Sequence, residues 1–166
     1  MKKQTRLYNV ILPVWLILAI PSPLWLAVLP ANLLVDCLVL FLTLTALRHA
    51  RRGTVLKRLW WKLWLLGFAA DAVGIVWLFL GAFLSPYVLG DLFYDTLRYL
   101  FHNPFGHVSA FLWTLIGVAL SGACIYFFDK RATRSCDLLD HRQRHVIALT
   151  MAIVTAPWLF FIPTRL

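Results

Sequence analysis

The positive charges of this chain fall into three short clusters that are separated by long apolar stretches. The clusters lie at residues 2–6, 48–62 and 130–144, and of the sixteen Lys and Arg residues only Arg98 and Arg165 lie elsewhere. Loops rich in Lys and Arg stay on the cytoplasmic side of a membrane. The sequence therefore predicts a multi-pass membrane protein with all three clusters on the cytoplasmic side.

The composition excludes an ordinary soluble domain. Hydrophobic residues make up 61% of the 166 residues and the mean hydropathy is +0.78, whereas soluble domains contain roughly 45–50% apolar residues. A formal net charge of +9 raises the question of a nucleic-acid partner. The basic residues flank the apolar spans, however, where they meet anionic lipid head groups. We expect the lipid bilayer, and no nucleic acid, as the partner of this charge.

A transmembrane helix needs about 20 apolar residues, because the hydrocarbon core is about 30 Å thick. The first apolar run is interrupted by Pro21 and Pro23, and we interpret it as an uncleaved first span. Residues 24–29 either complete this span or lie along the outer interface. The five predicted spans cover approximately 7–29, 31–47, 63–84, 108–128 and 146–162.

These spans predict an all-α fold: a polytopic integral membrane protein with a compact bundle of five transmembrane helices. We expect a single membrane domain over residues 1–166. Alternate crossings from a cytoplasmic N-terminus leave every basic cluster inside and place the C-terminus outside. We expect the protein to lie in a bacterial plasma membrane.

A helix is also predicted within the outer connection between the third and fourth spans. Leu97, Leu100 and Phe101 recur there at helical spacing, and polar residues occupy the opposite side. Residues 91–102 should therefore form an amphipathic helix in the outer interface, ended by the Asn-Pro pair at 103–104.

A further helix start is predicted on the cytoplasmic side, ahead of the last span. The Ser135 side chain can accept a hydrogen bond from the first turn, and Asp137 would place a negative charge at the positive end of the helix. We expect this helix to run without interruption into the span over 146–162.

Two aspartates, Asp36 and Asp71, lie inside apolar spans. A carboxylate at membrane depth costs a few kcal/mol to insert, so it is usually paired, hydrated or protonated and faces the protein interior. The second and third spans form a hairpin, and the midpoint between the two aspartates falls at Gly53 and Thr54 in the basic loop. We therefore expect the two carboxylates to lie at similar depth.

Small and polar residues indicate how these helices face one another. Three glycines recur every seven residues along the third span and mark a closely packed face. Asp71 lies one turn after the first of them, so it should point into the bundle. The glycines are Gly67, Gly74 and Gly81, the Asp36 face of the second span also carries Asn32 and Thr43, and the matching face of the fourth span carries Thr114 and Ser121.

These polar residues allow three interpretations. Asp36, Asp71, Asn32, Thr43, Thr114 and Ser121 are candidates to line the path of a ligand or an ion. Alternatively, the aspartates are structural and hydrogen-bond to a neighbouring helix. A pair of carboxylates that share a proton could also be catalytic, but the GxGD context of intramembrane aspartyl proteases is absent.

The outer helix and the segment after it form a second candidate site. Carboxylates, a guanidinium and imidazoles follow one stripe, which suits a zwitterionic ligand, a partner domain or a divalent metal. The same pattern is typical of the solvated face of an interfacial helix, and we assign no metal to it. The stripe consists of Asp91, Asp95, Arg98, His102 and His107.

No catalytic or cofactor motif is identified in the sequence, so the expected function follows from the spans and the aspartates. We expect a protein that binds or translocates a small molecule or ion, or that is the membrane subunit of a larger assembly with other membrane proteins. The alternatives are an intramembrane hydrolase or transferase that uses Asp36 and Asp71, and a structural or scaffolding membrane protein.

Overall fold

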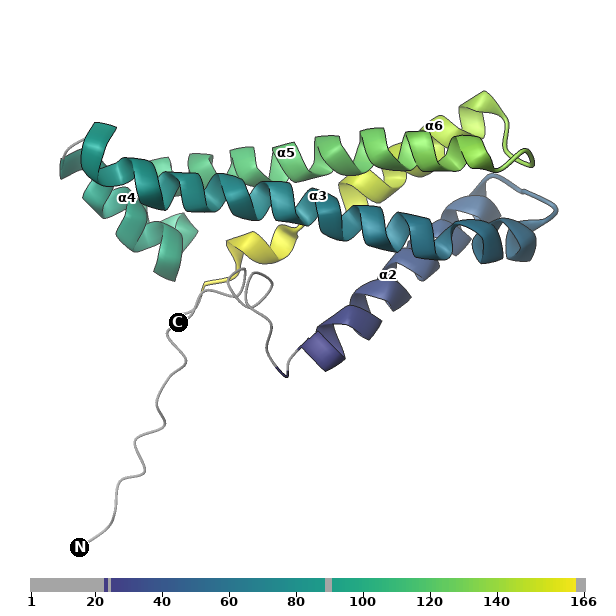
Figure 1. Ribbon diagram of the computed structural model, residues 1–166, viewed down its shortest axis with the longest axis horizontal. Helices are drawn as coiled ribbons and strands as arrows, with labels where there is room; N and C mark the ends of the chain where they lie inside the picture. The colour runs from purple at the N-terminus through teal and green to yellow at the C-terminus, as the bar shows by residue number, and fades with distance from the viewer. Residues whose placement is uncertain (1–22, 24, 89–90, 164–166) are drawn as a thin grey trace, which may run out of the picture.

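The computed structural model describes residue 23, residues 25–88 and residues 91–163, apart from the side chains at 82, 84–88 and 91–95. Every regular element in this part of the chain is helical, as the all-α prediction requires (Figure 1). The α-helices are α2 (Trp25–Ala46), α3 (Arg52–Val88), α4 (Asp91–His102), α5 (Val108–Ala132) and α6 (His141–Val154), and the short 3-10 helices are η1 (Pro104–Gly106), η2 (Thr133–Ser135) and η3 (Trp158–Phe161).

Four helical segments are long and apolar enough to cross a membrane. They cover Trp25–Ala46, Arg52–Gly81, Val108–Ser135 and His141–Phe161, with mean hydropathy between 1.5 and 2.2. The prediction of a multi-pass membrane protein in contact with lipid is confirmed at this level. Residues 7–22 of the predicted first span lie outside the described residues, so the count of five spans stays a prediction.

Helices α3 and α5 run side by side, α2 packs against α3, α6 packs against α5, and α2 and α6 pack against each other (Figure 1). Helix α4 folds back against the far ends of α3 and α5. Two apolar clusters fill the interior. One includes Leu44, Leu59 and Ile147, and the other, beside α4, includes Leu78 and Leu100.

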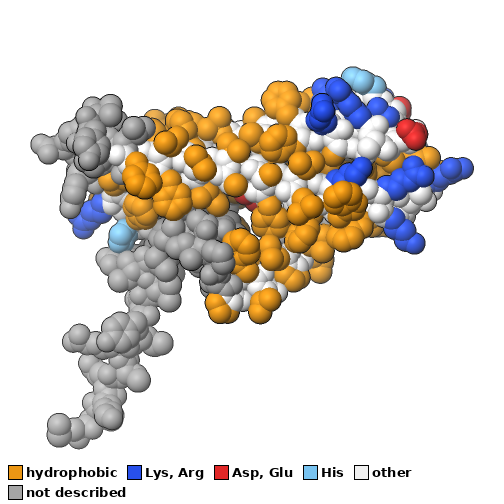
Figure 2. All heavy atoms as spheres, viewed as in Figure 1, with side chains coloured by type: hydrophobic (Ala, Val, Ile, Leu, Met, Phe, Trp, Pro, Cys, Tyr) orange, Lys and Arg blue, Asp and Glu red, His pale blue; other side chains and the backbone are white. Residues whose placement is uncertain are grey.

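Two of the predicted basic clusters come together at one end of the bundle. The loop after α2 contacts the loop after α5, because Nε2 of His49 lies 2.9 Å from the carbonyl oxygen of Leu138. Close by, Nζ of Lys62 donates a hydrogen bond of 2.7 Å to Oγ of Ser135. Most of the Lys and Arg side chains of the visible face gather at this end (Figure 2). We call this the basic end.

The boundary predicted between the first and second spans is wrong. Residues 25–29 belong to α2, which begins at Trp25 and contains Pro30. Proline lacks the N–H that would bond to the carbonyl of Leu26, four residues earlier. This loss falls near the start of the helix, so α2 continues through Pro30 and the span begins earlier than the sequence suggested.

Helix α2 ends in a Schellman turn, which makes the hairpin to α3 short. The N–H of Arg48 donates to the carbonyl of Thr45, and the N–H of His49 donates to the carbonyl of Leu44. Arg48 takes a left-handed conformation with φ of 51°, as the C′ residue of this motif requires. Helix α3 then begins at Arg52, well before the predicted start of the third span.

The hairpin turn lies earlier in the chain than the sequence suggested, at residues 47–51 and not around Gly53. Across the hairpin, a Cβ added to Gly67 would lie 3.8 Å from Oδ2 of Asp36. Asp71 follows Gly67 by one turn, which is about 6 Å along the helix. Asp36 therefore lies against α3 about one turn before Asp71.

The start of α6 also differs from the prediction. Asp140 and Gln143 form a capping box, in which each side chain accepts a hydrogen bond from the other residue's backbone N–H. This arrangement satisfies two N–H groups at once, so the helix begins at His141. Ser135 instead ends η2 and Asp137 precedes the helix, so the predicted cap at Ser135 is wrong.

Glycines bring α3 and α5 into direct contact, as the stripe on the third span predicts. A Cβ on Gly74 would collide with Oγ of Ser121 and would lie 3.1 Å from the carbonyl oxygen of Gly117. A Cβ on Gly81 would lie 2.6 Å from the indole nitrogen of Trp113. Neither position has room for a methyl group, so both glycines are needed for this helix separation.

A tryptophan pair fixes the same interface. Nε1 of Trp77 donates to the carbonyl of Trp113 at 3.1 Å, and Nε1 of Trp113 donates to the carbonyl of Trp77 at 3.2 Å. The two rings stack with centroids 4.4 Å apart. This reciprocal arrangement holds α3 and α5 in one register, because a shift of either helix would break both hydrogen bonds.

The predicted helix over residues 91–102 is confirmed as α4, and its end at Asn103 is confirmed as well. Oδ1 of Asn103 accepts a hydrogen bond from the N–H of Phe105 and caps η1. Leu100 is buried against Leu78 and Phe160. The apolar side of α4 is thus covered by the bundle, and its placement in the outer interface stays a prediction.

Gly74→Ala should destabilise the protein by about 1–3 kcal/mol, because the added methyl group overpacks the contact with Ser121. Thermal unfolding in detergent measures the effect. Gly53→Ala is the matched control, since a Cβ there meets nothing within 4 Å, and it should unfold at or slightly above the wild-type temperature. Equal unfolding temperatures for the two variants would remove the argument for close packing.

Labelling of single cysteines in intact cells should place the basic end inside. In a variant without the native cysteines, Gly53→Cys should resist a membrane-impermeant maleimide until the cells are opened, because positive loops stay cytoplasmic. Arg98→Cys on α4, which is exposed in the structure, should react in intact cells. The reverse labelling pattern would contradict the proposed orientation.

Candidate functional site

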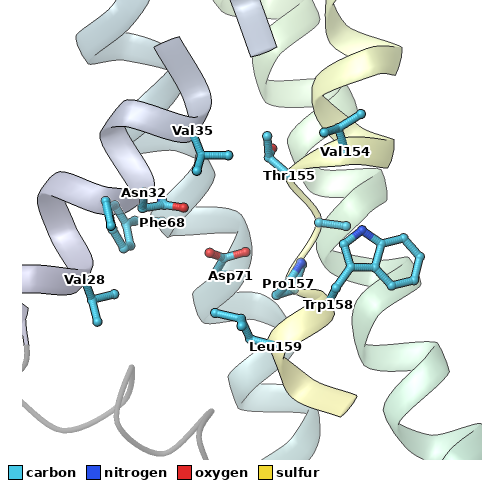
Figure 3. Close-up of a pocket in the computed structure, with 12 residues that line it drawn as sticks. Val28, Asn32, Val35, Phe68, Asp71, Val154, Thr155, Pro157, Trp158 and Leu159 are labelled. Atoms are coloured by element: carbon cyan, nitrogen blue, oxygen red, sulfur yellow. The ribbon is translucent and has the colours of Figure 1, made fainter. Parts of the chain in front are cut away.

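A cavity of about 390 Å³ lies between α2, α3 and the segment that follows α6. Figure 3 shows the carboxylate of Asp71 extending from α3 into this space, with the amide of Asn32 on α2 and the hydroxyl of Thr155 nearby. The lining is Val28, Ala31, Asn32, Val35, Phe68, Asp71 and residues 154–159. Two residues of the predicted path, Asn32 and Asp71, therefore share one cavity.

The cavity forms where α6 breaks at Val154, although the last span was predicted to run to residue 162. In a continuing helix, residue 157 would donate its N–H to the carbonyl of Ile153, but Pro157 has no N–H. The indole Nε1 of Trp158 donates to that carbonyl instead, at 2.9 Å. The predicted span over 146–162 thus falls in the candidate span His141–Phe161, which consists of α6 and η3 with Pro157 between them.

The break directs the negative end of α6 to the cavity. The N–H and the hydroxyl of Thr155 both donate to the carbonyl of Met151, at 2.8 and 2.9 Å, and close the last turn. Carbonyls in the last turn of a helix lack helical partners and carry partial negative charge. Val154 and Thr155 both line the cavity, so this end of α6 disfavours an anion and favours a cation there.

Among the described residues, Asp71 has no positive partner at this site. No Lys, Arg or His belongs to the described lining of the cavity. Oδ1 of Asp71 is buried and lacks a hydrogen-bond partner. A buried carboxylate without a partner is costly, so this position calls for a proton, a cation or ordered water.

A second cavity, of about 320 Å³, lies on the other side of Asp71. Trp25 and Leu29 of α2 and Trp64 of α3 contribute to its lining. Phe68 and Asp71 line both cavities. Asp71 therefore borders two hollows together with Phe68, a residue that the sequence did not single out.

Asp36 lies deeper in the bundle than Asp71. It is 5% exposed, and its carboxylate is in contact distance of Gly67 and not among the described residues that line the cavities. Of the two carboxylates, only Asp71 belongs to the described lining of a cavity.

A third buried carboxylate, Asp129 on α5, was missed in the sequence. It is 1% exposed, and neither of its oxygens has a hydrogen-bond partner among the described residues. The sequence could have predicted this burial from the small-residue face of the fourth span, because Asp129 lies eight residues after Ser121 on the buried side of the helix.

The other predicted path residues lie in helix interfaces away from the described cavity linings. Oγ1 of Thr43 donates to the carbonyl of Val39 in its own helix at 2.7 Å. Thr114 and Ser121 are fully buried on α5, and their hydroxyl oxygens have no hydrogen-bond partner. These three residues thus serve the packing of the bundle, and Ser121 lies against Gly74.

The described residues of the outer stripe lie on two elements: Arg98 and His102 belong to α4, and His107 lies at the start of α5. Arg98 is exposed, and Nδ1 of His102 lies 3.0 Å from the carbonyl oxygen of Arg98. His107 instead caps α5: its Nδ1 accepts from the N–H of Ser109, and its ring stacks on Tyr99. His107 is thus held beside α4 through Tyr99, and the side chains of Asp91 and Asp95 lie outside the described residues, so a ligand at the stripe stays a prediction.

Within the described part of the chain, no three His, Cys, Asp or Glu side chains lie close enough to hold a metal ion. Comparison with known protein families, curated proteins and solved structures found no match to this chain. Its function is therefore argued from the cavity and its charges.

Trp158→Phe should destabilise the bundle by about 1–3 kcal/mol, because the carbonyl of Ile153 would lose the indole donor that replaces the missing N–H. Trp60→Phe is the control, since Trp60 is also exposed to a substantial degree and lies on α3, far along the chain from the break. Thermal unfolding in detergent should show a clear loss for the first variant and little change for the second. Similar values would mean that this hydrogen bond does not support the break.

Proposed function

We propose that this membrane protein binds, and by extension translocates, a small cation or a cationic solute at Asp71. The observation that carries this proposal is the buried, unpartnered Oδ1 of Asp71 at a cavity of about 390 Å³. Ionisable residues at membrane depth are rare and mark ion and substrate pathways. The cavity supplies the space that a purely structural aspartate would not need.

The charges around the cavity favour a cation over an anion. Asp71 is the only ionisable residue in its described lining, and the end of α6 adds the partial negative charge of its last carbonyls. Asn32 and Thr155 offer neutral oxygens beside the carboxylate. Oxygen ligands of this kind suit a monovalent cation, a proton or an ammonium group.

The backbone around the site supports transport as the wider role. Irregular backbone at membrane depth is tolerated where it lines a cavity. In many transporters the ends of broken helices coordinate the coupling ion near the middle of the membrane. The break after Val154 and the two hollows beside Asp71 fit this arrangement.

The alternatives are less well supported by the same geometry. An enzyme that used Asp36 and Asp71 as a pair would need both carboxylates at one accessible cleft, but Asp36 is not among the described residues lining the two cavities at Asp71. A scaffold would seal both aspartates by helix contacts, whereas Asp71 faces a cavity.

Asp71→Asn should abolish stabilisation by the cation while leaving the protein folded. Asparagine keeps the size of the side chain but removes the charge. A ligand that binds only the folded protein stabilises it by RT ln(1 + [L]/Kd), so this stabilisation disappears when the affinity is lost. The measurement is a thermal-unfolding series of the purified protein with sodium, potassium and methylammonium chlorides, against choline chloride at the same ionic strength.

Asp137→Asn is the matched control, because Asp137 is exposed in the loop before α6. It should respond to the active cation as the wild type does. If a cation stabilised Asp71→Asn as much as the wild type, Asp71 would not be its binding site. If none of the cations stabilised the wild type, the proposed class of ligand would be wrong.

A further inference from the structure

A groove of about 350 Å³ lies at the basic end, on the outside of the bundle between α3 and α5. It does not include Asp71 and is independent of the function proposed above. One wall comes from α3 and the other from α5. Its lining consists of Trp61, Lys62, Leu65, Leu66, Phe128, Arg131 and Ala132.

The end of the groove near the loops is positive. Lys62 and Arg131 line it from the two helices, and no carboxylate belongs to its described lining. Nζ of Lys62 is held in place by Ser135, at 2.7 Å, and lies 5.7 Å from the ring centroid of Trp61. Asp129 on α5 does not neutralise this charge from the groove side, since it is buried inside the bundle.

The rest of the groove is apolar and continues toward the middle of the span. Leu65 and Leu66 follow Lys62 by one turn of α3, and Phe128 precedes Arg131 by one turn of α5. Because the two helices run in opposite directions, both steps lead away from the basic end. Leu65 is 51% exposed and offers a hydrocarbon surface at this depth.

We propose that this groove binds one phospholipid with a net negative head group. The phosphate lies between Lys62 and Arg131, and one acyl chain follows Leu65, Leu66 and Phe128. Basic pockets between transmembrane helices on the cytoplasmic side recognise anionic head groups in this way. Trp61 lies at the level where aromatic residues meet the interface.

The lining also explains a preference for anionic over zwitterionic lipid. A choline or ethanolamine group needs a carboxylate or an open aromatic face for its positive charge. The described groove has no carboxylate, and the amine of Lys62 already lies over the ring of Trp61. Two cations thus face a phosphate, and the described lining offers no carboxylate to a positive head group.

Native mass spectrometry of the purified protein tests the site, with equal amounts of phosphatidylglycerol and phosphatidylcholine added in detergent. The wild type should retain phosphatidylglycerol preferentially. The Lys62→Gln/Arg131→Gln double variant should lose this lipid by about fivefold for each cation removed. The control pair, Arg134→Gln/Arg142→Gln, removes two exposed cations outside the groove and should retain the lipid.

If the two double variants lost phosphatidylglycerol to the same extent, the groove would not be a specific lipid site. The result would then indicate only a general attraction of anionic lipid to the basic end. If millimolar inorganic phosphate removed the preference for phosphatidylglycerol, the groove would bind phosphate without recognising an acyl chain. This result would also contradict the proposal. A charge-preserving variant, Lys62→Arg/Arg131→Lys, should bind as the wild type does.

A second measurement needs no destabilising variant. The wild type is reconstituted into two kinds of mixed vesicle: one holds brominated phosphatidylglycerol with unlabelled phosphatidylcholine, and the other holds brominated phosphatidylcholine with unlabelled phosphatidylglycerol. Tryptophan fluorescence should be quenched more strongly in the first kind of vesicle. Trp61→Phe should reduce this difference, because the indole of Trp61 lines the groove. Equal quenching by the two lipids in the wild type would exclude selective binding.

Discussion

The close approach of α3 and α5 at Gly74 is the contact on which the rest of the structure depends. Because neither Gly74 nor Gly117 carries a side chain, the two helices touch through Ser121 and backbone atoms. In a membrane, where lipid is as apolar as leucine, such van der Waals contact is a main source of helix association. The reciprocal hydrogen bonds of Trp77 and Trp113 then hold one register. Helices α2 and α6 pack on this pair, and the space they leave becomes the cavity at Asp71.

The break in α6 turns that space into a site with a defined charge. A continuous helix would cover its own carbonyls, whereas the proline at 157 ends the helix and leaves its negative end beside Asp71. Trp158 reduces the free-energy cost of the break, because its indole N–H donates to the carbonyl of Ile153, to which Pro157 has no N–H to donate. The carboxylate and the helix end then act in the same direction. Both oppose an anion, and together they create the demand for a cation that the proposed function satisfies.

Charge is sorted along the bundle. The carboxylates of Asp36, Asp71 and Asp129 lie on α2, α3 and α5, whereas most of the Lys and Arg side chains visible in Figure 2 gather at the basic end. We propose that these cations face lipid head groups and that the groove at Lys62 and Arg131 binds one lipid specifically.

The sequence by itself determined the membrane class, the approximate spans, the helix over 91–102 and the close-packed glycine face, because each depends on local composition or helical period. It also identified Asp71 and Asn32 as polar residues of one interior. Only the tertiary structure decided the one-turn offset of Asp36, the burial of Asp129 and the end of α6 before Pro157. These depend on which groups meet across helices: a short hairpin sets the register, a neighbouring helix covers a carboxylate, and an indole replaces a missing N–H. Such contacts join residues that no local pattern connects.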